Sequence, residues 1–526
     1  MKLLVHRGGI RGLDSFRSSF RRRELRWRGG NHRARLHWSL AVERYWAQIA
    51  TLRWMRASTT LPLLSGGQTG QLASRGLAVR RLGAQAGLSD LERKLELRVT
   101  PVLSSHFGRT LHAQALGLSH ALVTLSSATS GSSGAARHEP PRMPRFQVGL
   151  VFHLRKDRST DPWLHARAVR QIFAWLRDHP GYEALVVGLD AASGELDQPP
   201  SDFVPAFRLA LEELAGSEGP YRRPLTLGLT FHVGEDFRDL LTGIRQVDLA
   251  LRLLLLRPGD RLGHALALGL DPAFWYQRQG GTSVLQIGDH LLDLLWARHL
   301  LRLAPPMDGS LSGQVGNRLE RLGWRDLDGA QAVVTKWLEG PYAREIERES
   351  VLKQRLVAHL ATGLRPESLY EVEVSDGWIA IVSAMQSAVA RSVERQGICI
   401  EANPSSNLAI SGLSRLEDLP LFRQHPILPS PSAPHPPLRL SISTDDPGLF
   451  QTGPREEYGL LFATALDQAT HTREEVLSWL DRLRGIGYES SFLLGRAATG
   501  EQFLEYLRQL TAQRSRPAQA RRLARA

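Results

Sequence analysis

The stretch "LTFHVGED", residues 229–236, ends an apolar run with a histidine, a glycine and a glutamate. Its apolar residues alternate with others, as in a β-strand, and residues 237–255 then place apolar side chains at helical spacing. A strand that passes through a polar turn into a helix is the repeating unit of parallel α/β folds. His232 and Glu235 are either a solvated strand end or a metal ligand beside a proton donor, and this motif alone leaves both interpretations open.

The composition excludes several classes of protein. The chain has 526 residues and a single cysteine, Cys399, so we expect neither a disulfide framework nor a thiolate zinc cluster. No apolar run reaches the ~18 residues that span a bilayer. The first residues lack an apolar signal segment, so we expect a cytoplasmic protein without a membrane partner.

The net charge of +13 comes almost entirely from arginine. Arginine pairs well with phosphate, so a nucleic-acid partner is one interpretation of the charge. A base-composition bias of the genome explains the same charge without any function. We favour this second interpretation, because the sequence contains none of the common nucleic-acid-binding motifs.

Seven strand-like runs recur along the chain, and helical stretches separate most of them. This alternation is typical of a parallel α/β architecture. Seven strands are one fewer than a (β/α)₈ barrel contains, so we predict a TIM-type barrel that lacks its first strand. The runs are residues 94–103, 146–154, 184–190, 225–233, 261–268, 397–404 and 438–447.

Residues 270–396 interrupt this rhythm, and their apolar spacing predicts a large helical insertion. The predicted organisation has five parts in all. They are an Arg-rich, mostly helical N-terminal region (1–93), the first part of the barrel (94–269), the insertion (270–396), the last part of the barrel with its closing helices (397–510) and a basic tail (511–526).

Polar residues stand at the ends of the later strand-like runs. Taken singly, each has an ordinary explanation, such as a core histidine or an aspartate turn. The carboxyl ends of parallel strands meet at one mouth of a barrel, however, so residues far apart in sequence are expected to converge there. These residues are His232, Glu235, His264, Asn403, Ser405, Asn407, Asp445 and Asp446.

Four of these segments resemble, in order, the motifs of the adenosine deaminase family. They are "FHVGED", "RLGHALALG", "EANPSSN" and "SISTDDP", and "LELRVTPVLS" and "VVGLDAASGE" are weaker matches. The resemblance covers about residues 94–270 and 397–495. It implies a barrel of the metal-dependent hydrolase kind that deaminates adenosine or an adenine nucleotide to the inosine form, with Zn²⁺ as its cofactor.

The resemblance also implies roles for individual residues. His232 and Asp445 would be zinc ligands, and Glu235 would donate a proton to a ring nitrogen of the purine. His264 would orient or deprotonate the zinc-bound water. Asp446 would accept a hydrogen bond at the five-membered ring of the purine.

The family's first strand carries an H-x-H motif that supplies two more zinc ligands, and this chain has no H-x-H. "GLDSFRSSF", residues 12–20, resembles the helix that follows that strand, so we expect the first strand to lie upstream of Met1. A catalytic zinc site takes about three protein ligands. We therefore expect weakened zinc binding, unless His6, His106 or another chain compensates.

Two further departures concern the substrate and the assembly. The family's A-G-x-E is "AASGE" in this chain, so either Ser193 or Gly194 takes the position of the substrate-contacting glycine. The long insertion and the Arg-rich N-terminal region suggest a specialised branch. The large deaminase-like proteins of bacterial antiviral systems, which form shells, are one such branch, and homo-oligomers would be expected of it.

Three hypotheses of function remain. The first is a zinc-dependent deaminase in purine nucleotide metabolism, whose substrate is a free nucleoside, a nucleotide or RNA. The second is a catalytically inactive deaminase-like barrel that serves as an assembly or binding subunit, which the missing H-x-H favours. The third is another metal-dependent amidohydrolase, and the adjacent Asp445 and Asp446 favour purine deamination over it.

Overall fold

The structure is a computed structural model, and it describes residues 94–99, 147–156, 161, 163–178, 186–216, 227–303, 309–324, 327–338, 348–360, 364–411, 413, 415–445 and 452–494. The predicted N-terminal region, the basic tail and Asp446 lie outside the described residues, so the expectations for them stay predictions.

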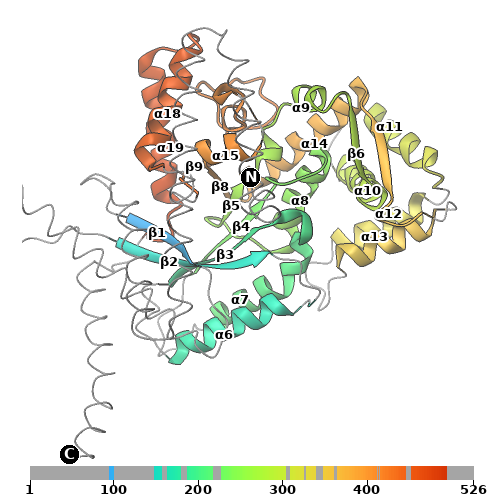
Figure 1. Cartoon of the computed structure of the whole chain (residues 1–526), viewed down its shortest axis with the longest axis horizontal. Coiled ribbons are helices and arrows are strands. Elements are labelled where there is room, and N and C mark those ends of the chain that lie inside the picture. The colour runs from blue at the N-terminus through green and yellow to red at the C-terminus, as the bar shows by residue number, and fades with distance from the viewer. Residues whose placement is uncertain are drawn as a thin grey trace, which may run out of the picture.

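Seven strands form one parallel sheet in the order β1-β2-β3-β4-β5-β8-β9 (Figure 1). They coincide with the seven predicted runs, which confirms the strand positions and the parallel α/β class. β1 and β9 are the two edges of the described sheet, so closure into an eight-stranded barrel stays a prediction. The strands are β1 (Lys94–Val99), β2 (Gln147–Lys156), β3 (Val186–Ser193), β4 (Gly228–Val233), β5 (Arg261–His264), β8 (Cys399–Ala402) and β9 (Leu440–Ile442).

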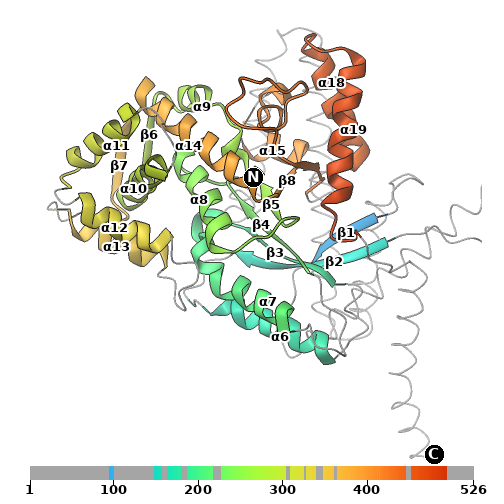
Figure 2. The ribbon, with the colours of Figure 1, turned by 180° about the vertical axis from the view of Figure 1, so that it is seen from behind.

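Two groups of helices flank the sheet and a third lies between β5 and β8. α6 and α7 pack together along one side, and α18 and α19 stand beside β9 (Figure 1). The helices between β5 and β8 lie on the side away from α18 and α19 (Figure 2). No helix in the described ranges combines the length and apolar character that a bilayer crossing needs. The helices are α6 (Leu164–Asp178), α7 (Val204–Gly216), α8 (Leu240–Leu253), α9 (Pro272–Arg278), α10 (Ile287–Leu303), α11 (Gly309–Arg321), α12 (Leu327–Leu338), α13 (Glu349–Ala358), α14 (Asp376–Arg395), α15 (Pro404–Ile410), α16 (Leu421–Gln424), α18 (Pro454–Asp467) and α19 (Arg473–Glu489).

The sheet curls around its own interior. β1 and β8 are separated by four strands in the sheet order, yet Arg98 of β1 forms an ion pair with Glu401 of β8. Arg261 of β5 also reaches β1, with 2.6 Å between its Nη2 and Oε2 of Glu96. Side chains of such distant strands meet only when a sheet is curved as in a barrel. The contacts therefore support a sheet that is curved as in the predicted barrel, although β1 and β9 are not paired in the described sheet.

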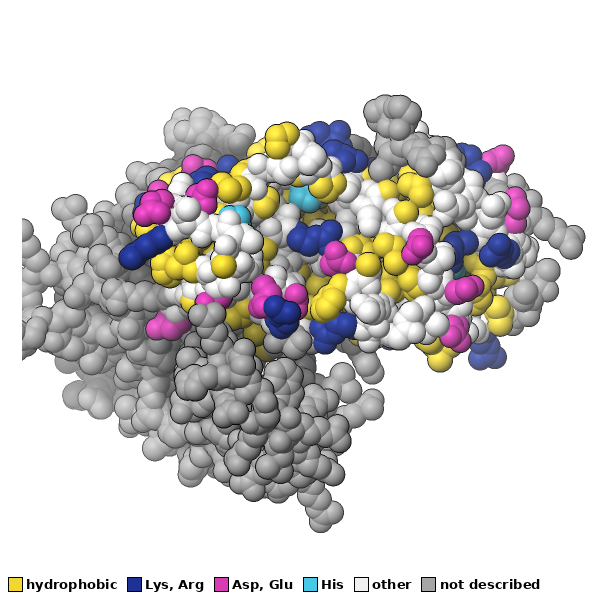
Figure 3. Space-filling model, turned by 90° about the horizontal axis from the view of Figure 1, so that it is seen from above, with side chains coloured by type: hydrophobic (Ala, Val, Ile, Leu, Met, Phe, Trp, Pro, Cys, Tyr) yellow, Lys and Arg dark blue, Asp and Glu magenta, His cyan; other side chains and the backbone are white. Residues whose placement is uncertain are grey.

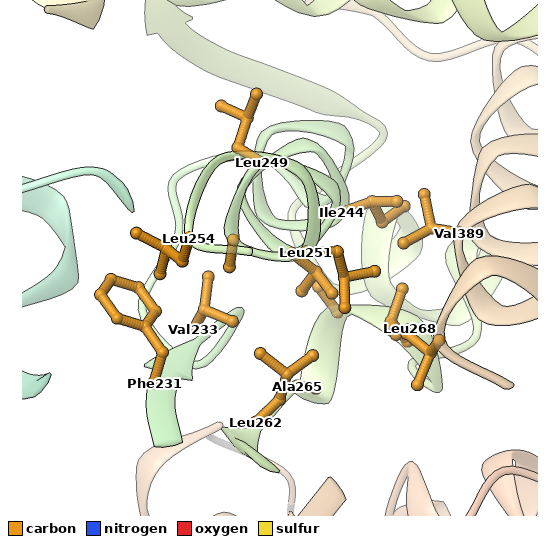
Figure 4. Packing of buried hydrophobic residues seen from close by; sticks show 14 of the residues in the cluster. Phe231, Val233, Ile244, Leu249, Leu251, Leu254, Leu262, Ala265, Leu268 and Val389 are labelled. Carbon is orange, nitrogen blue, oxygen red and sulfur yellow. The ribbon is translucent and has the colours of Figure 1, made fainter. Parts of the chain in front are cut away.

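Apolar packing fixes β4, the strand that contains most of the segment 229–236. Phe231 and Val233 of β4 point toward α8, and Ile244 of this helix lies beside Val389 of α14 (Figure 4). All four side chains are buried. The Asp239 side chain caps α8 by accepting a hydrogen bond from a backbone N–H of the first turn. Packing on one side and the cap on the other therefore hold the turn between β4 and α8 in place.

A buried ionic cluster joins the segment between β5 and β8 to the rest of the fold. Arg245 of α8 is fully buried and pairs with Asp293 of α10 and, at 3.1 Å, with Glu349 of α13. Lys353 also binds Glu349, with 2.7 Å between Nζ and Oε1. Burial raises the pKa of Asp293 to about 7, although Arg245 opposes the shift. Because buried charges need partners, this cluster holds α10 and α13 against α8.

The same segment contains an antiparallel pair of strands, β6 (Thr282–Gln286) and β7 (Leu369–Glu373). The sequence analysis predicted a mostly helical insertion here and did not predict these two strands. Each strand has five residues, which gives too little alternation to distinguish a strand from irregular chain.

We predict that Gly228→Ala destabilises the fold by about 1–3 kcal/mol, the usual cost of overpacking. A Cβ at Gly228 would lie 2.1 Å from ring atoms of Phe492, whose ring also stacks on Arg261. Chemical unfolding measures the loss. The matched control is Gly459→Ala in α18, where nothing lies within 4 Å of the new Cβ. The free energy of unfolding of this control should be unchanged or raised by up to about 1 kcal/mol. Equal stabilities of the two variants would contradict the close packing of Gly228 against Phe492.

Candidate functional site

Several strands end at one edge of the sheet with unusual backbone. Six non-glycine residues of the described chain have positive φ, and four of them lie at the ends of β3, β5 and β9. They are Ser193 (97°), His264 (64°), Ala265 (44°) and Asp445 (58°). This conformation is costly for residues with a Cβ and concentrates at functional sites. The residues with unusual backbone conformation therefore lie at the same edge of the sheet as the polar motifs.

Asp190 of β3 is the centre of the deeper part of this edge. Its side chain is fully buried, and each of its oxygens bonds to a histidine. The distance is 3.0 Å from His232 Nδ1 to Oδ1 and 3.0 Å from His153 Nδ1 to Oδ2. Burial alone would raise the pKa of Asp190, but His232 and the guanidinium of Arg98 hold it well below its usual range. An ionised Asp190 favours the tautomer of each imidazole that donates from Nδ1.

Arg98 of β1 lies against the other nitrogen of His232. Its Nη1 is 3.1 Å from His232 Nε2, and its Nε is 3.3 Å from Asp190 Oδ2. Its remaining terminal nitrogen pairs with Glu401. Burial is the first cause that lowers the pKa of His232, so this imidazole is neutral near pH 7. A neutral imidazole with Nδ1 donating to Asp190 presents an Nε2 lone pair to the guanidinium.

Glu401 of β8 is the fourth member of a charged wall that Asp190, His232 and Arg98 form with it. Arg261 binds its second oxygen, with 2.8 Å between Nε and Oε1. Burial alone would raise the pKa of Glu401, yet Arg98 and Arg261 together lower it to about 2. Gly263 lies between His232 and Glu401 in the strand register, and a Cβ there would be 2.7 Å from His232 Cγ. Glycine at this position therefore makes room for the imidazole ring.

The outer part of the edge holds a second histidine and a carboxyl group. His264 Nε2 lies 3.3 Å from Glu235 Oε2, and both side chains are buried. On the other side, His264 Nδ1 is 2.7 Å from Asn407 Oδ1. Burial alone would lower the pKa of His264, but the carboxylates of Glu235 and Asp445 outweigh it and raise the pKa. The amide oxygen thus fixes the imidazole, and Nε2 can exchange a proton with Glu235.

Asp445 lies in the same group. Its Oδ2 accepts a hydrogen bond from the Ser406 hydroxyl, and burial is the main influence that would raise its pKa. The nearby His264 and His232 reverse that influence and lower the pKa. The rings of His232 and His264 are 5.2 Å apart between centroids. The structure therefore brings together four of the predicted site residues, while Asp446 lies outside the described chain.

Two residues that the sequence analysis did not select brace the tip of β4. Glu195 Oε2 accepts hydrogen bonds from the backbone N–H groups of Glu235, at 3.1 Å, and of Asp236, at 3.3 Å. The buried Lys156 donates to the carbonyl oxygen of His232, and burial lowers its pKa. Together they fix the backbone on both sides of Gly234, and with it the direction of the Glu235 side chain.

The geometry bears on the choice between Ser193 and Gly194. Ser193 has a φ of 97°, a conformation that glycine adopts without strain, whereas Gly194 has a φ of −62°. Ser193 therefore has the backbone conformation that favours a glycine. Its contact with a substrate stays a prediction.

The described residues do not fit a zinc ion. Within the described ranges, no group of three or more His, Cys, Asp or Glu side chains is arranged to hold a metal. His232 and Asp445 are the two predicted ligands in the described chain, and His232 Nε2 faces the cation of Arg98 at 3.1 Å. We therefore assign no chemical step to a zinc ion.

Four of the residues that the sequence analysis missed share one signal. Glu96, Arg98, Asp190 and Glu401 are charged residues within strands whose neighbours are apolar. A charge in a buried strand requires a partner, so each predicts an internal ion pair. The sequence could not identify the partners, because they lie on different strands.

Comparisons with known proteins add little. No protein-family model and no curated protein matches the sequence. Among solved structures, the chain is similar to an adenine deaminase from Arthrobacter aurescens, with 13% identity over 84% of this chain and 80% of that chain and a TM-score of 0.39. A similarity this distant carries no argument about function.

We predict that Glu401→Gln lowers the free energy of unfolding by about 3 kcal/mol at pH 7, because it removes the buried carboxylate that Arg98 and Arg261 share. In the described structure each guanidinium then keeps one carboxylate partner, Asp190 for Arg98 and Glu96 for Arg261. The folded pKa of about 2 is below the ordinary value of 4.5. The contribution of the carboxylate is therefore complete above about pH 4.5 and is lost as the pH falls toward 2.

Urea unfolding of both proteins at a series of pH values tests this prediction. The difference should be constant from pH 7 to about 5 and shrink at lower pH. Glu489→Gln is the control, since its ion pair with Arg439 is exposed and should contribute less than about 1 kcal/mol. A Glu401→Gln difference that grows on acidification would contradict the assigned charges.

Proposed function

We propose that this chain is a deaminase-type hydrolase that removes the amino group of adenosine or an adenine nucleotide. The observation that carries the proposal is the buried contact between Glu235 and His264, with Asp445 in the same group. A carboxyl group and an imidazole within 3.3 Å form an acid–base pair of the kind that proton transfer in hydrolysis needs.

Each residue of the pair has a separate task in this proposal. Glu235 is 8% exposed, so a ring nitrogen of the purine that reaches its carboxyl group would meet a proton donor shielded from water. His264, held by Asn407, keeps its Nε2 toward Glu235. As water adds to the purine carbon that bears the amino group, His264 would accept the proton that the water loses, and the amino group would take up a proton and leave as ammonia. Glu195 keeps the backbone of Glu235 in place while the proton moves. Zinc dependence and a purine contact of Asp446 stay predictions.

A second candidate function is a binding or assembly subunit without turnover. The contact of Arg98 with His232 Nε2 favours it, because a deaminase of the resembled family uses the His232 position for its metal. In that case the Glu235–His264 pair would bind a purine through hydrogen bonds and release it unchanged.

The nature of the partner also remains a proposal. On the face shown in Figure 3, basic and acidic side chains of the described residues are interspersed and form no basic patch. This face therefore gives no support for RNA as the substrate. Homo-oligomers and a cytoplasmic location stay predictions.

We predict that Glu235→Gln reduces the rate of adenosine deamination by about 10²–10⁴-fold, the usual contribution of a positioned proton donor. Ammonia release from adenosine, AMP and a short adenine-containing RNA, each assayed with and without added zinc, measures the rate and ranks the substrates. Asp236→Asn is the matched control. It removes a carboxylate from the next residue, and the rate should change by less than about threefold, since it takes no part in the proton transfer.

Equal rates in wild-type protein and Glu235→Gln would refute the proton-donor role. No turnover by the wild-type protein with any of these substrates would refute the deaminase proposal. Calorimetry would then test the second candidate, which predicts that adenosine binds to the wild-type protein and binds more weakly to Glu235→Gln.

A further inference from the structure

The guanidinium of Arg98 is surrounded by the groups that a cation at this wall would contact. It lies 3.1 Å from His232 Nε2 and 3.3 Å from Asp190 Oδ2, and it pairs with Glu401. Asp190 and Glu401 have exposed side-chain fractions of 0% and 5%. The wall therefore contains two buried carboxylates, Asp190 and Glu401. The positive charges that face them are Arg98 on one side and Arg261 on the other.

His232 has the orientation that a metal-binding histidine takes. Its Nδ1 is hydrogen-bonded to a buried carboxylate, which fixes the ring and increases the basicity of Nε2. Histidines bound to metals are commonly held in this way. The single lone pair of Nε2 cannot bind a metal ion while it accepts a hydrogen bond from Arg98.

We propose that Arg98 competes with divalent metal ions for His232, so that a metal binds this wall only when the guanidinium moves away. The proposal goes beyond the proposed function, since it concerns metal affinity and stands whether or not the chain deaminates purines. It also gives a physical reason to expect weak metal binding, and this reason is independent of the missing H-x-H.

The choice between arginine and metal follows from electrostatics. Among the described residues, loss of the guanidinium would leave Asp190 with its two histidine partners and without an arginine, and Glu401 with Arg261 as its remaining arginine. Two partly compensated carboxylates beside a free imidazole nitrogen attract a divalent ion strongly in a site with little water. The two carboxylates therefore retain Arg98 in the absence of metal and would attract metal in the absence of Arg98.

The test measures the zinc affinity of the full chain by competition with a chromophoric chelator. Arg98→Met should bind zinc at least tenfold more tightly than the wild-type protein, and its Tm should rise on addition of zinc. Cobalt added to Arg98→Met should give the visible absorption of a nitrogen-ligated, four- or five-coordinate ion. His232→Ala in the same variant should abolish the gain.

Arg261→Met is the matched control. It removes the same group from Glu401, but Arg261 has no contact with His232 in the described structure, so zinc affinity should stay within about threefold of wild type. If Arg98→Met does not fold without metal, the double variant Arg98→Met with Glu401→Gln removes a cation and an anion together. It should still bind zinc more tightly than the wild-type protein, but by a smaller factor, because Asp190 is then the one carboxylate of the wall that remains beside His232.

Three results would overturn the proposal. One is tight binding of one zinc per wild-type chain that Arg98→Met leaves unchanged. Another is a gain in affinity that survives His232→Ala, and the third is an equal gain in Arg261→Met. None of these results depends on the deamination assay, so the failure of one proposal can be distinguished from the failure of the other.

Discussion

The buried carboxylate of Asp190 is the constraint on which the rest of the site depends. It is fully buried on β3 and bonds to His153 of β2, His232 of β4 and Arg98 of β1. A buried anion without partners would cost several kcal/mol, so the fold must bring these three strands to one level. The orientation of His232 follows from that requirement.

The side chains around Asp190 form a lower, charged layer, and Glu235, His264 and Asp445 form an upper layer at the ends of the strands. The Glu235–His264 pair has hydrogen-bonding neighbours that fix its geometry, and Asp445 adds negative charge. In the described structure, the lower layer consists of charged side chains that pair with one another, whereas the upper one lies where the strands end. Under the proposed function, the lower layer would serve stability and the upper layer would exchange protons with a ligand.

Much of the fold could be predicted from the sequence, because it depends on local patterns. The seven strands, the helix after "LTFHVGED" and the gathering of His232, His264 and Asp445 follow from apolar spacing and from the parallel arrangement. The contact of Arg98 with His232 could not be predicted, since it joins residues 134 positions apart across a curved sheet. The β6–β7 pair is too short to give a clear alternation, and the φ of Ser193 depends on its surroundings.

The same limit applies to function. Motifs that resemble a deaminase gave the residues of the acid–base pair, but they could not show which cation stands beside His232. A crystal structure of the full chain, grown without added metal, tests the central claim most directly. The account predicts the Arg98 guanidinium within hydrogen-bonding distance of His232 Nε2 and Asp190. An Arg98 side chain turned away from both, with His232 Nδ1 separated from Asp190, would contradict it.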